Sequence, residues 1–135
     1  MLVHFPAAMF PADLLLAYLY KITGTPSMTM ASFYFLEAGV LFGWLAAVAG
    51  FLDLIPLGEH NPRAFKKAFI HGSIQVVVLI SYTWLAFLKF KEYPSVNPDL
   101  NSIIGLKTGL VMLLIFGNFI GGELILRDKV AVRNP

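Results

Sequence analysis

Four ionisable residues stand near the ends of long apolar stretches, and their types suit metal or haem chemistry. His4 begins the first stretch, Asp53 ends the second, His71 begins the third and Glu123 ends the fourth. Imidazole nitrogens coordinate haem iron, and imidazoles combined with carboxylates can hold zinc or iron. Whether these four side chains can act together depends on how the apolar stretches are arranged.

The composition is that of an integral membrane protein. Of 135 residues, 58% are hydrophobic and only 13% are charged, whereas about a quarter are charged in ordinary globular chains. The absence of cysteine excludes disulfides, iron–sulfur clusters, thiolate metal sites and covalently attached c-type haem. The net charge of +2 comes without a basic stripe, so no nucleic-acid partner is expected.

Four segments are apolar enough to cross a bilayer, which requires about 20 helical residues per span. They cover residues 2–20, 32–55, 69–88 and 102–126. The stretches TGTPSMTM, GEHNPRAFKKA and FKEYPSVNPDLN between them carry the proline, glycine or asparagine typical of breaks. Helices joined by short loops pack as antiparallel neighbours. We therefore expect one all-α domain over residues 1–135, an antiparallel up-down four-helix bundle in the membrane.

Basic residues in the loops and tails favour both termini in the cytoplasm under the positive-inside rule. Six lie on the side of the termini, namely Arg63, Lys66, Lys67, Arg127, Lys129 and Arg133. Four lie on the other side, namely Lys21, Lys89, Lys91 and Lys107.

In this topology His4, Asp53, His71 and Glu123 come from four different helices and lie near one membrane face. Gln75 lies one turn deeper on the His71 face of the third helix. Ionisable groups within spans usually face the bundle interior and mark function. We therefore predict that these side chains converge.

Small residues form stripes beside this predicted cluster. Going back from Asp53 along the second helix, they recur at alternating steps of three and four, as Gly50, Ala46, Gly43 and Gly39. The fourth helix has Gly117, Gly121 and Gly122 before Glu123. Such stripes more often serve close helix packing, but they also leave room for a flat cofactor. The sequence leaves both interpretations open.

Several stretches together resemble a family of uncharacterised bacterial four-helix membrane proteins, a domain of unknown function whose members are in some cases fused to Rieske iron–sulfur domains. They are VHFPAAMFPADLL, GVLFGWLAAVAGFLDL, the His71-Gly72 pair and GGELILRDKVAV. The family pattern corresponds here to His4, Asp53, His71, Gly121 and Gly122. The resemblance implies a bacterial inner-membrane protein with redox neighbours.

The first functional hypothesis is a small b-type cytochrome or electron-transfer subunit. His4 and His71 would be the axial ligands of haem b, reaching across the bundle from the diagonal first and third helices. The remaining predicted contacts are Gly50, Gly121 and Gly122 beside the ring, and Arg63, Lys66 or Arg127 at the propionates. The electron partner would be a redox protein or a quinone.

The second hypothesis is a non-enzymatic structural or assembly subunit, either a homo-oligomer or part of a larger membrane complex. Asp53, Glu123 and Gln75 would then join the histidines in a polar cluster that fixes helix register. A divalent-metal site or ion pathway on the same residues is a third possibility. The sequence has no nucleophile with an activating base, so we do not expect a stand-alone enzyme.

Two further acidic residues stand apart from this cluster. Asp13 lies about 13 Å deeper than His4 and about half a turn out of phase with it. It could pair with a polar side chain such as Tyr82, be protonated, or face another subunit. Glu37 is expected at the opposite membrane interface. Pro11, one turn into the first helix, is expected to bend it.

Overall fold

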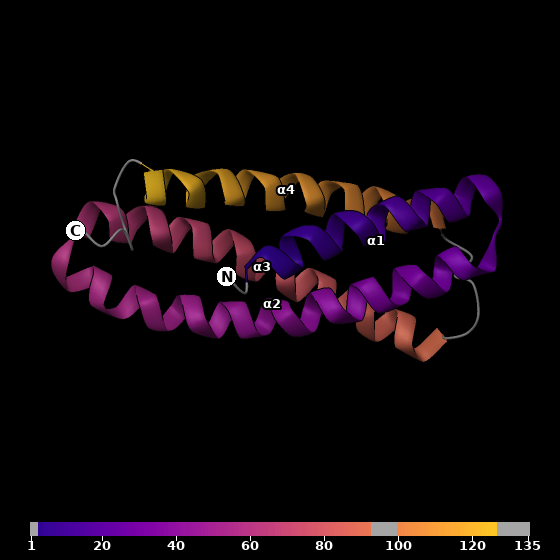
Figure 1. The fold of residues 1–135 in the computed structure, drawn as a ribbon, viewed down its shortest axis with the longest axis horizontal. Coiled ribbons are helices and arrows are strands. Elements are labelled where there is room, and N and C mark those ends of the chain that lie inside the picture. The colour runs from indigo at the N-terminus through magenta and orange to yellow at the C-terminus, as the bar shows by residue number, and fades with distance from the viewer. Residues whose placement is uncertain (1–2, 93–99, 127–135) are drawn as a thin grey trace.

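The computed structural model describes residues 3–92 and 100–126, which form four helices and their connections (Figure 1). The helices are α1 (His4–Thr23), α2 (Pro26–His60), α3 (Pro62–Glu92) and α4 (Leu100–Leu126). Each runs beyond its expected span at one end or both, and α1 continues through Pro11. The predicted all-α four-helix fold is confirmed.

The first two connections are much shorter than the sequence pattern predicted. Gly24 ends α1 with a left-handed φ of 66°, and its N–H donates to the Tyr20 carbonyl at 2.8 Å. Pro26 then begins α2 at once, because its fixed φ suits the first turn of a helix. At the next turn the Asn61 side chain accepts the N–H of Ala64 at 3.1 Å. Most of TGTPSMTM and GEHNPRAFKKA is therefore helical, and the expected long breaks were wrong.

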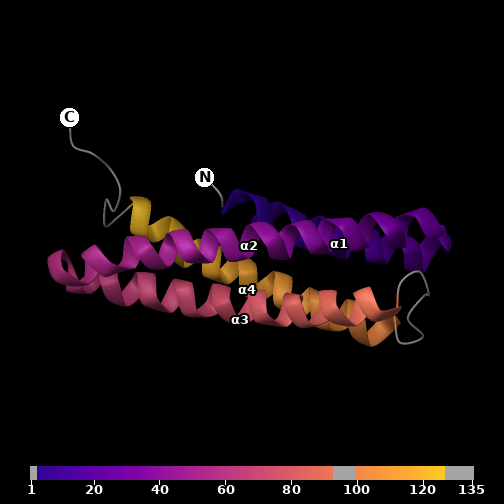
Figure 2. The same ribbon diagram turned by 90° about the horizontal axis from the view of Figure 1, so that it is seen from below.

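The helices form a ring in which sequence neighbours are antiparallel (Figures 1 and 2). Helix α1 packs against α2 and α4, and α3 also packs against α2 and α4. Among the described residues, α1 and α3 make no close backbone contact across the diagonal. This is the up-down arrangement that the sequence predicted.

Helix α1 is short and begins about halfway along α2, so it covers only one half of the bundle (Figure 1). The buried core lies in that half. It is built around Phe10, Leu36, Val78, Leu79, Tyr82, Leu85, Ala86, Leu110 and Leu114. The other half contains α2, α3 and α4 without α1 beside them.

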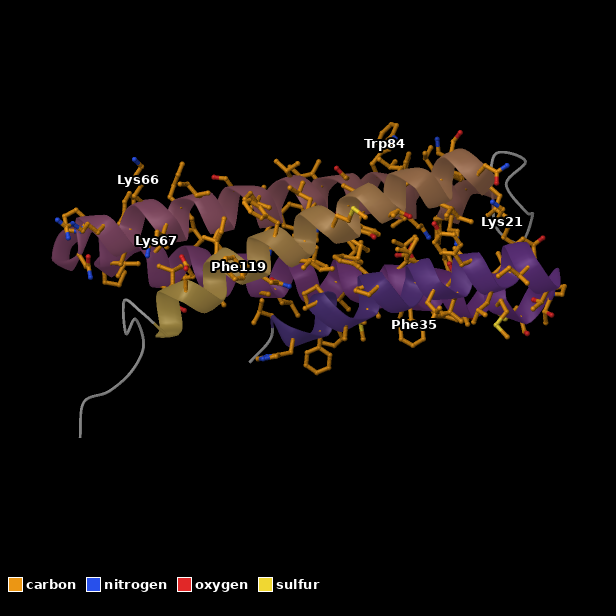
Figure 3. The ribbon with its side chains drawn as sticks, turned by 90° about the horizontal axis from the view of Figure 1, so that it is seen from above. Lys21, Phe35, Lys66, Lys67, Trp84 and Phe119 are labelled. Carbon is orange, nitrogen blue, oxygen red and sulfur yellow. The ribbon has the colours of Figure 1, made fainter. Side chains whose placement is uncertain are left out.

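Within residues 3–92 and 100–126, three helices are long and apolar enough to cross a membrane, namely α2, α3 and α4. The fourth expected span, in α1, is not among these three, and its crossing stays a prediction. In the most apolar 18-residue stretch of α2, only 6% of the residues are buried inside the bundle. Phe35 of α2 and Trp84 of α3 point outward on opposite sides of the bundle in Figure 3, and both are exposed. An exposed apolar surface suits contact with lipid.

Basic residues mark the two ends of the bundle. Lys21 lies at the α1–α2 end, whereas Lys66 and Lys67 lie toward the α2–α3 end (Figure 3). Lys107, one of the four basic residues counted on the side opposite the termini, is 1% exposed inside the bundle. Residues 127–135, with three of the basic residues used for orientation, lie outside the described residues. The cytoplasmic placement of both termini stays a prediction.

Candidate functional site

A largely apolar groove of about 550 Å³ opens where α1 begins. The start of α1 contributes Val3, Pro6 and Phe10, and the remaining walls come mainly from α2 and α3. Small residues of α2 and α3 line much of it, including Gly43, Ala46, Gly50 and Gly72. Its volume lies within the usual range of ligand pockets, about 300–1,000 Å³. We refer to it below as the groove.

His71 lines the groove and is fixed by α4. Its Nδ1 lies 2.6 Å from the carbonyl oxygen of Gly117. A backbone carbonyl only accepts hydrogen bonds, so Nδ1 must carry the proton. In the neutral ring Nε2 is then the basic nitrogen, the form in which histidine coordinates a metal. A backbone carbonyl on the second nitrogen is a usual partner of a metal-binding histidine.

The glycines of α4 create the space that this histidine occupies. A Cβ added at Gly121 would lie 2.8 Å from Cε1 and 3.0 Å from Nδ1 of His71. A Cβ at Gly117 would lie 2.8 Å from Nε2 of Gln75. Gly122 has nothing within 4 Å of the same position. Gly117 and Gly121 therefore serve close packing between α3 and α4, while Gly122 takes no part in it.

Gln75 supports the same contact one turn along α3. Its Nε2 donates to the Asn118 side-chain oxygen at 2.9 Å. Gln75 thus lies one turn from His71, as predicted, but its amide nitrogen pairs with Asn118. Asn118 was not among the residues predicted for the site. The sequence did offer a signal for Asn118, because an amide side chain inside an apolar span requires a polar partner.

The α2 stripe divides into two parts. A Cβ at Gly39 would lie 2.7 Å from the Phe10 ring, and one at Gly43 would lie 2.6 Å from Leu79. These glycines allow neighbouring side chains to pack against the helix. Gly50 and Gly72 have nothing within 4 Å and border open space in the groove. The α2 stripe thus serves close packing at Gly39 and Gly43, whereas at Gly50 it borders the groove.

His4 does not lie level with His71. Phe10 of α1 stacks on Tyr82 of α3 with ring centroids 3.9 Å apart, which sets the register of these parallel helices. His4 precedes Phe10 by six residues on α1, and Val76 precedes Tyr82 by six residues on α3. His4 therefore lies at about the level of Val76. His71 is about five residues further, or about 7.5 Å along the axis. The His4 side chain is exposed, next in sequence to the groove-lining Val3.

Asp53 and Glu123 lie at nearly the same level as His71. Gly43 faces Leu79, and α2 and α3 are antiparallel. Asp53, ten residues after Gly43, therefore lies opposite about Phe69, ten residues before Leu79. On α4, Glu123 follows by two residues Gly121, which faces His71. Asp53 is nevertheless exposed on α2, and Glu123 is half-buried.

The basic residues predicted near the propionates are only partly described. Arg63 and Lys66 are exposed at the start of α3, on the far side of His71 from the core. Arg127 lies outside the described residues. His60 belongs to the end of α2, and nothing is described of its side chain.

A buried polar network lies in the other half of the bundle, and the sequence analysis missed most of it. Both carboxylate oxygens of Asp13 lie within 2.7 Å of Lys107 Nζ. Ser32 donates to Asp13 at 2.5 Å, and Lys89 donates to Ser32 at 2.9 Å. Asp13, Ser32 and Lys107 are at most 1% exposed. All four helices thus contribute to one network.

Lys107 could have been found from the sequence. It lies inside the predicted fourth span, where a lysine requires a partner, yet it was used only in the count of basic residues that sets the orientation. Asp13 lies inside the first span, on a neighbouring helix in the predicted ring. Tyr82, the expected partner, is fully buried nearby, but its hydroxyl has no hydrogen-bond partner among the described residues.

Within residues 3–92 and 100–126, no three histidine or carboxylate side chains gather closely enough to hold a metal ion. A divalent-metal site of the kind considered from the sequence thus has no support in the described part of the chain. A haem site differs because the porphyrin supplies four of the iron ligands, leaving one or two to the protein.

The fold and its apolar surface define an α-helical membrane protein, with a groove at the point where α1 begins. The chain belongs to the family described as "Predicted membrane protein (DUF2231)", which matches residues 1–134. No curated protein and no solved structure matches the chain.

Proposed function

We propose that this protein is a membrane-embedded haem-binding subunit that transfers electrons, with haem b in the groove and His71 as an axial ligand. The observation that carries the proposal is the hydrogen bond from His71 Nδ1 to the Gly117 carbonyl, beside a groove of about 550 Å³. It leaves Nε2 of a groove-lining histidine with the lone pair that iron requires.

The walls of the groove favour a flat apolar ligand. Gly50 and Gly72 present backbone without a side chain, and neither has an atom within 4 Å of a Cβ position. A macrocycle can therefore approach α2 and α3 closely. Its propionates would point toward the α2–α3 end, where Lys66 lies about 7.5 Å along α3 from His71. Its electron partner would be a redox protein or a quinone.

The proposal has two forms, which differ in whether His4 is the second axial ligand of the haem iron. His4 begins α1 beside the groove, but the register places it about 7.5 Å from the level of His71. Coordination by both histidines would require the first turn of α1 to shift along the groove. Coordination by His71 alone would leave the iron five-coordinate.

The test is the visible spectrum of protein purified after expression with ample haem. The proposal predicts a Soret band that His71→Ala removes. A low-spin spectrum in the parent that becomes high-spin in His4→Ala would identify His4 as the second ligand. His60→Ala is the control and should leave the spectrum unchanged. A colourless parent protein would contradict the proposal.

A second candidate is a structural or assembly subunit without a cofactor, and the Asp13–Lys107 network favours it. The network joins all four helices, and α2 offers an exposed apolar face to an identical or different subunit. This candidate predicts a colourless protein whose oligomer weakens in Asp53→Ala and His71→Ala. Unchanged assembly of both variants, measured by light scattering in detergent, would count against it.

A further inference from the structure

Helix α1 differs from the other three helices in what can hold it in the membrane. It has 20 residues and is not among the helices apolar enough to cross. A buried carboxylate, Asp13, lies near its centre at 0% exposure. A charge inside a hydrocarbon layer is costly unless it is paired. Something in α2–α4 must therefore compensate for Asp13.

Lys107 of α4 supplies that compensation. Its Nζ lies 2.6 Å from one Asp13 oxygen and 2.7 Å from the other. Lys107 is itself 1% exposed, in a helix that is long and apolar enough to cross a membrane. Each charge thus neutralises the other, and loss of either leaves the remaining one buried without its direct ion-pair partner.

The same pair lies one turn from a wall of the groove. Phe10 precedes Asp13 by three residues on α1, stacks on Tyr82 and lines the groove. Val3 and Pro6, nearer the start of α1, line it too. The position of α1 therefore determines whether the groove has its third wall.

We propose that Asp13 and Lys107 are positioning residues that dock α1 onto a bundle of α2, α3 and α4, and so complete the groove. When one partner alone is lost, the charge that remains is buried without its partner, and α1 separates from α4 while α2–α4 stay packed. Ser32 and Lys89 extend the pair to the other two helices but bear no charge opposite to Lys107, so neither can replace Asp13. Docking is independent of whether the groove takes haem.

Because the chain has no cysteine, introduced thiols can report on docking. Tyr18→Cys with Thr108→Cys places thiols on α1 and α4, where the native hydroxyls lie 3.3 Å apart. Trp44→Cys with Thr83→Cys places them on α2 and α3, where the native side chains hydrogen-bond at 3.1 Å. A short bifunctional thiol reagent links each pair in membranes, and thiols left free are counted by maleimide-polymer gel shift.

We expect Lys107→Leu to reduce α1–α4 linking at least about tenfold, because it leaves a buried carboxylate unpaired, and to leave α2–α3 linking unchanged. Asp13→Leu combined with Lys107→Leu should restore α1–α4 linking, since an apolar pair removes the unpaired charge. Lys91→Leu, at an exposed lysine, is the control and should change neither link.

Three results would overturn the proposal. They are unchanged α1–α4 linking in Lys107→Leu, loss of both links in that variant, and failure of the double Leu variant to recover. None of these three linking results depends on a bound cofactor. A colourless protein would therefore contradict the haem proposal and leave the docking proposal to be decided by the linking experiment.

Discussion

Phe10 and Tyr82 join the two diagonal helices of the bundle, with their rings stacked 3.9 Å apart at an interplanar angle of 6°. The two side chains are 1% and 0% exposed, and they lie between the groove and the Asp13–Lys107 network. The stack sets the level of α1 relative to α3. It thereby separates His4 from His71 along the axis, although the sequence had suggested that they share one depth.

Tyr82→Phe should be neutral or stabilising. The Tyr82 hydroxyl is buried and has no hydrogen-bond partner among the described residues, so its removal relieves an unsatisfied group worth about 1–3 kcal/mol. Thermal unfolding in detergent measures the effect. Tyr18→Phe is the matched control, because the Tyr18 hydroxyl lies 3.3 Å from that of Thr108. A clear loss of stability in Tyr82→Phe would reveal a partner, such as ordered water.

Gly121→Ala should displace His71. The new Cβ would meet the imidazole at 2.8 Å, which forces the ring away from the Gly117 carbonyl. We expect haem affinity to fall by about tenfold or more, in the range of lost partners of metal-binding histidines. Gly122→Ala differs by one position and has open space, so it should bind as the parent does. Equal affinities in a haem titration would contradict this role for Gly121.

Gly50→Leu should block the groove without harming the fold. Gly50 borders the groove and has nothing within 4 Å of its Cβ position, so a leucine there fills open space rather than displacing a neighbour. Haem binding should be lost while thermal stability is kept. Gly105→Leu makes the same change at another open glycine, one outside the groove. If haem bound equally to both variants, it would occupy another place.

Gln75→Leu should weaken α3–α4 packing by about 0.6 kcal/mol, the typical coupling of a hydrogen bond between membrane helices. The bond from Gln75 to Asn118 is 2.9 Å long. A double-mutant cycle with Asn118→Leu isolates the coupling from the effects of each single change. Additive losses in the cycle would mean that the two amides do not support each other in the membrane.

The sequence was sufficient for the four helices and their antiparallel order. Apolar stretches of span length leave few alternatives in a bilayer, because backbone polar groups must be satisfied within each helix. The connections were harder to predict. Pro26 and Pro62 looked like breaks, yet each stands in the first turn of a helix, where proline is favoured.

The candidate site was predicted less well, because it depends on register between helices. Asp53, His71 and Glu123 do lie at about one level, but their side chains face different surroundings. The pairing of His71 with a backbone carbonyl of α4 leaves no trace in residue types. Asp13 with Lys107 was within reach of the sequence, since two opposite charges stood inside spans of adjacent helices.

The central claim is that Nε2 of His71 binds haem iron in the groove, and a haem titration followed by visible absorption tests it most directly. The account predicts a saturable Soret band in the parent and in Gly122→Ala, and none in His71→Ala although that variant folds. A parent protein without a Soret band, or an unchanged band in His71→Ala, would contradict it.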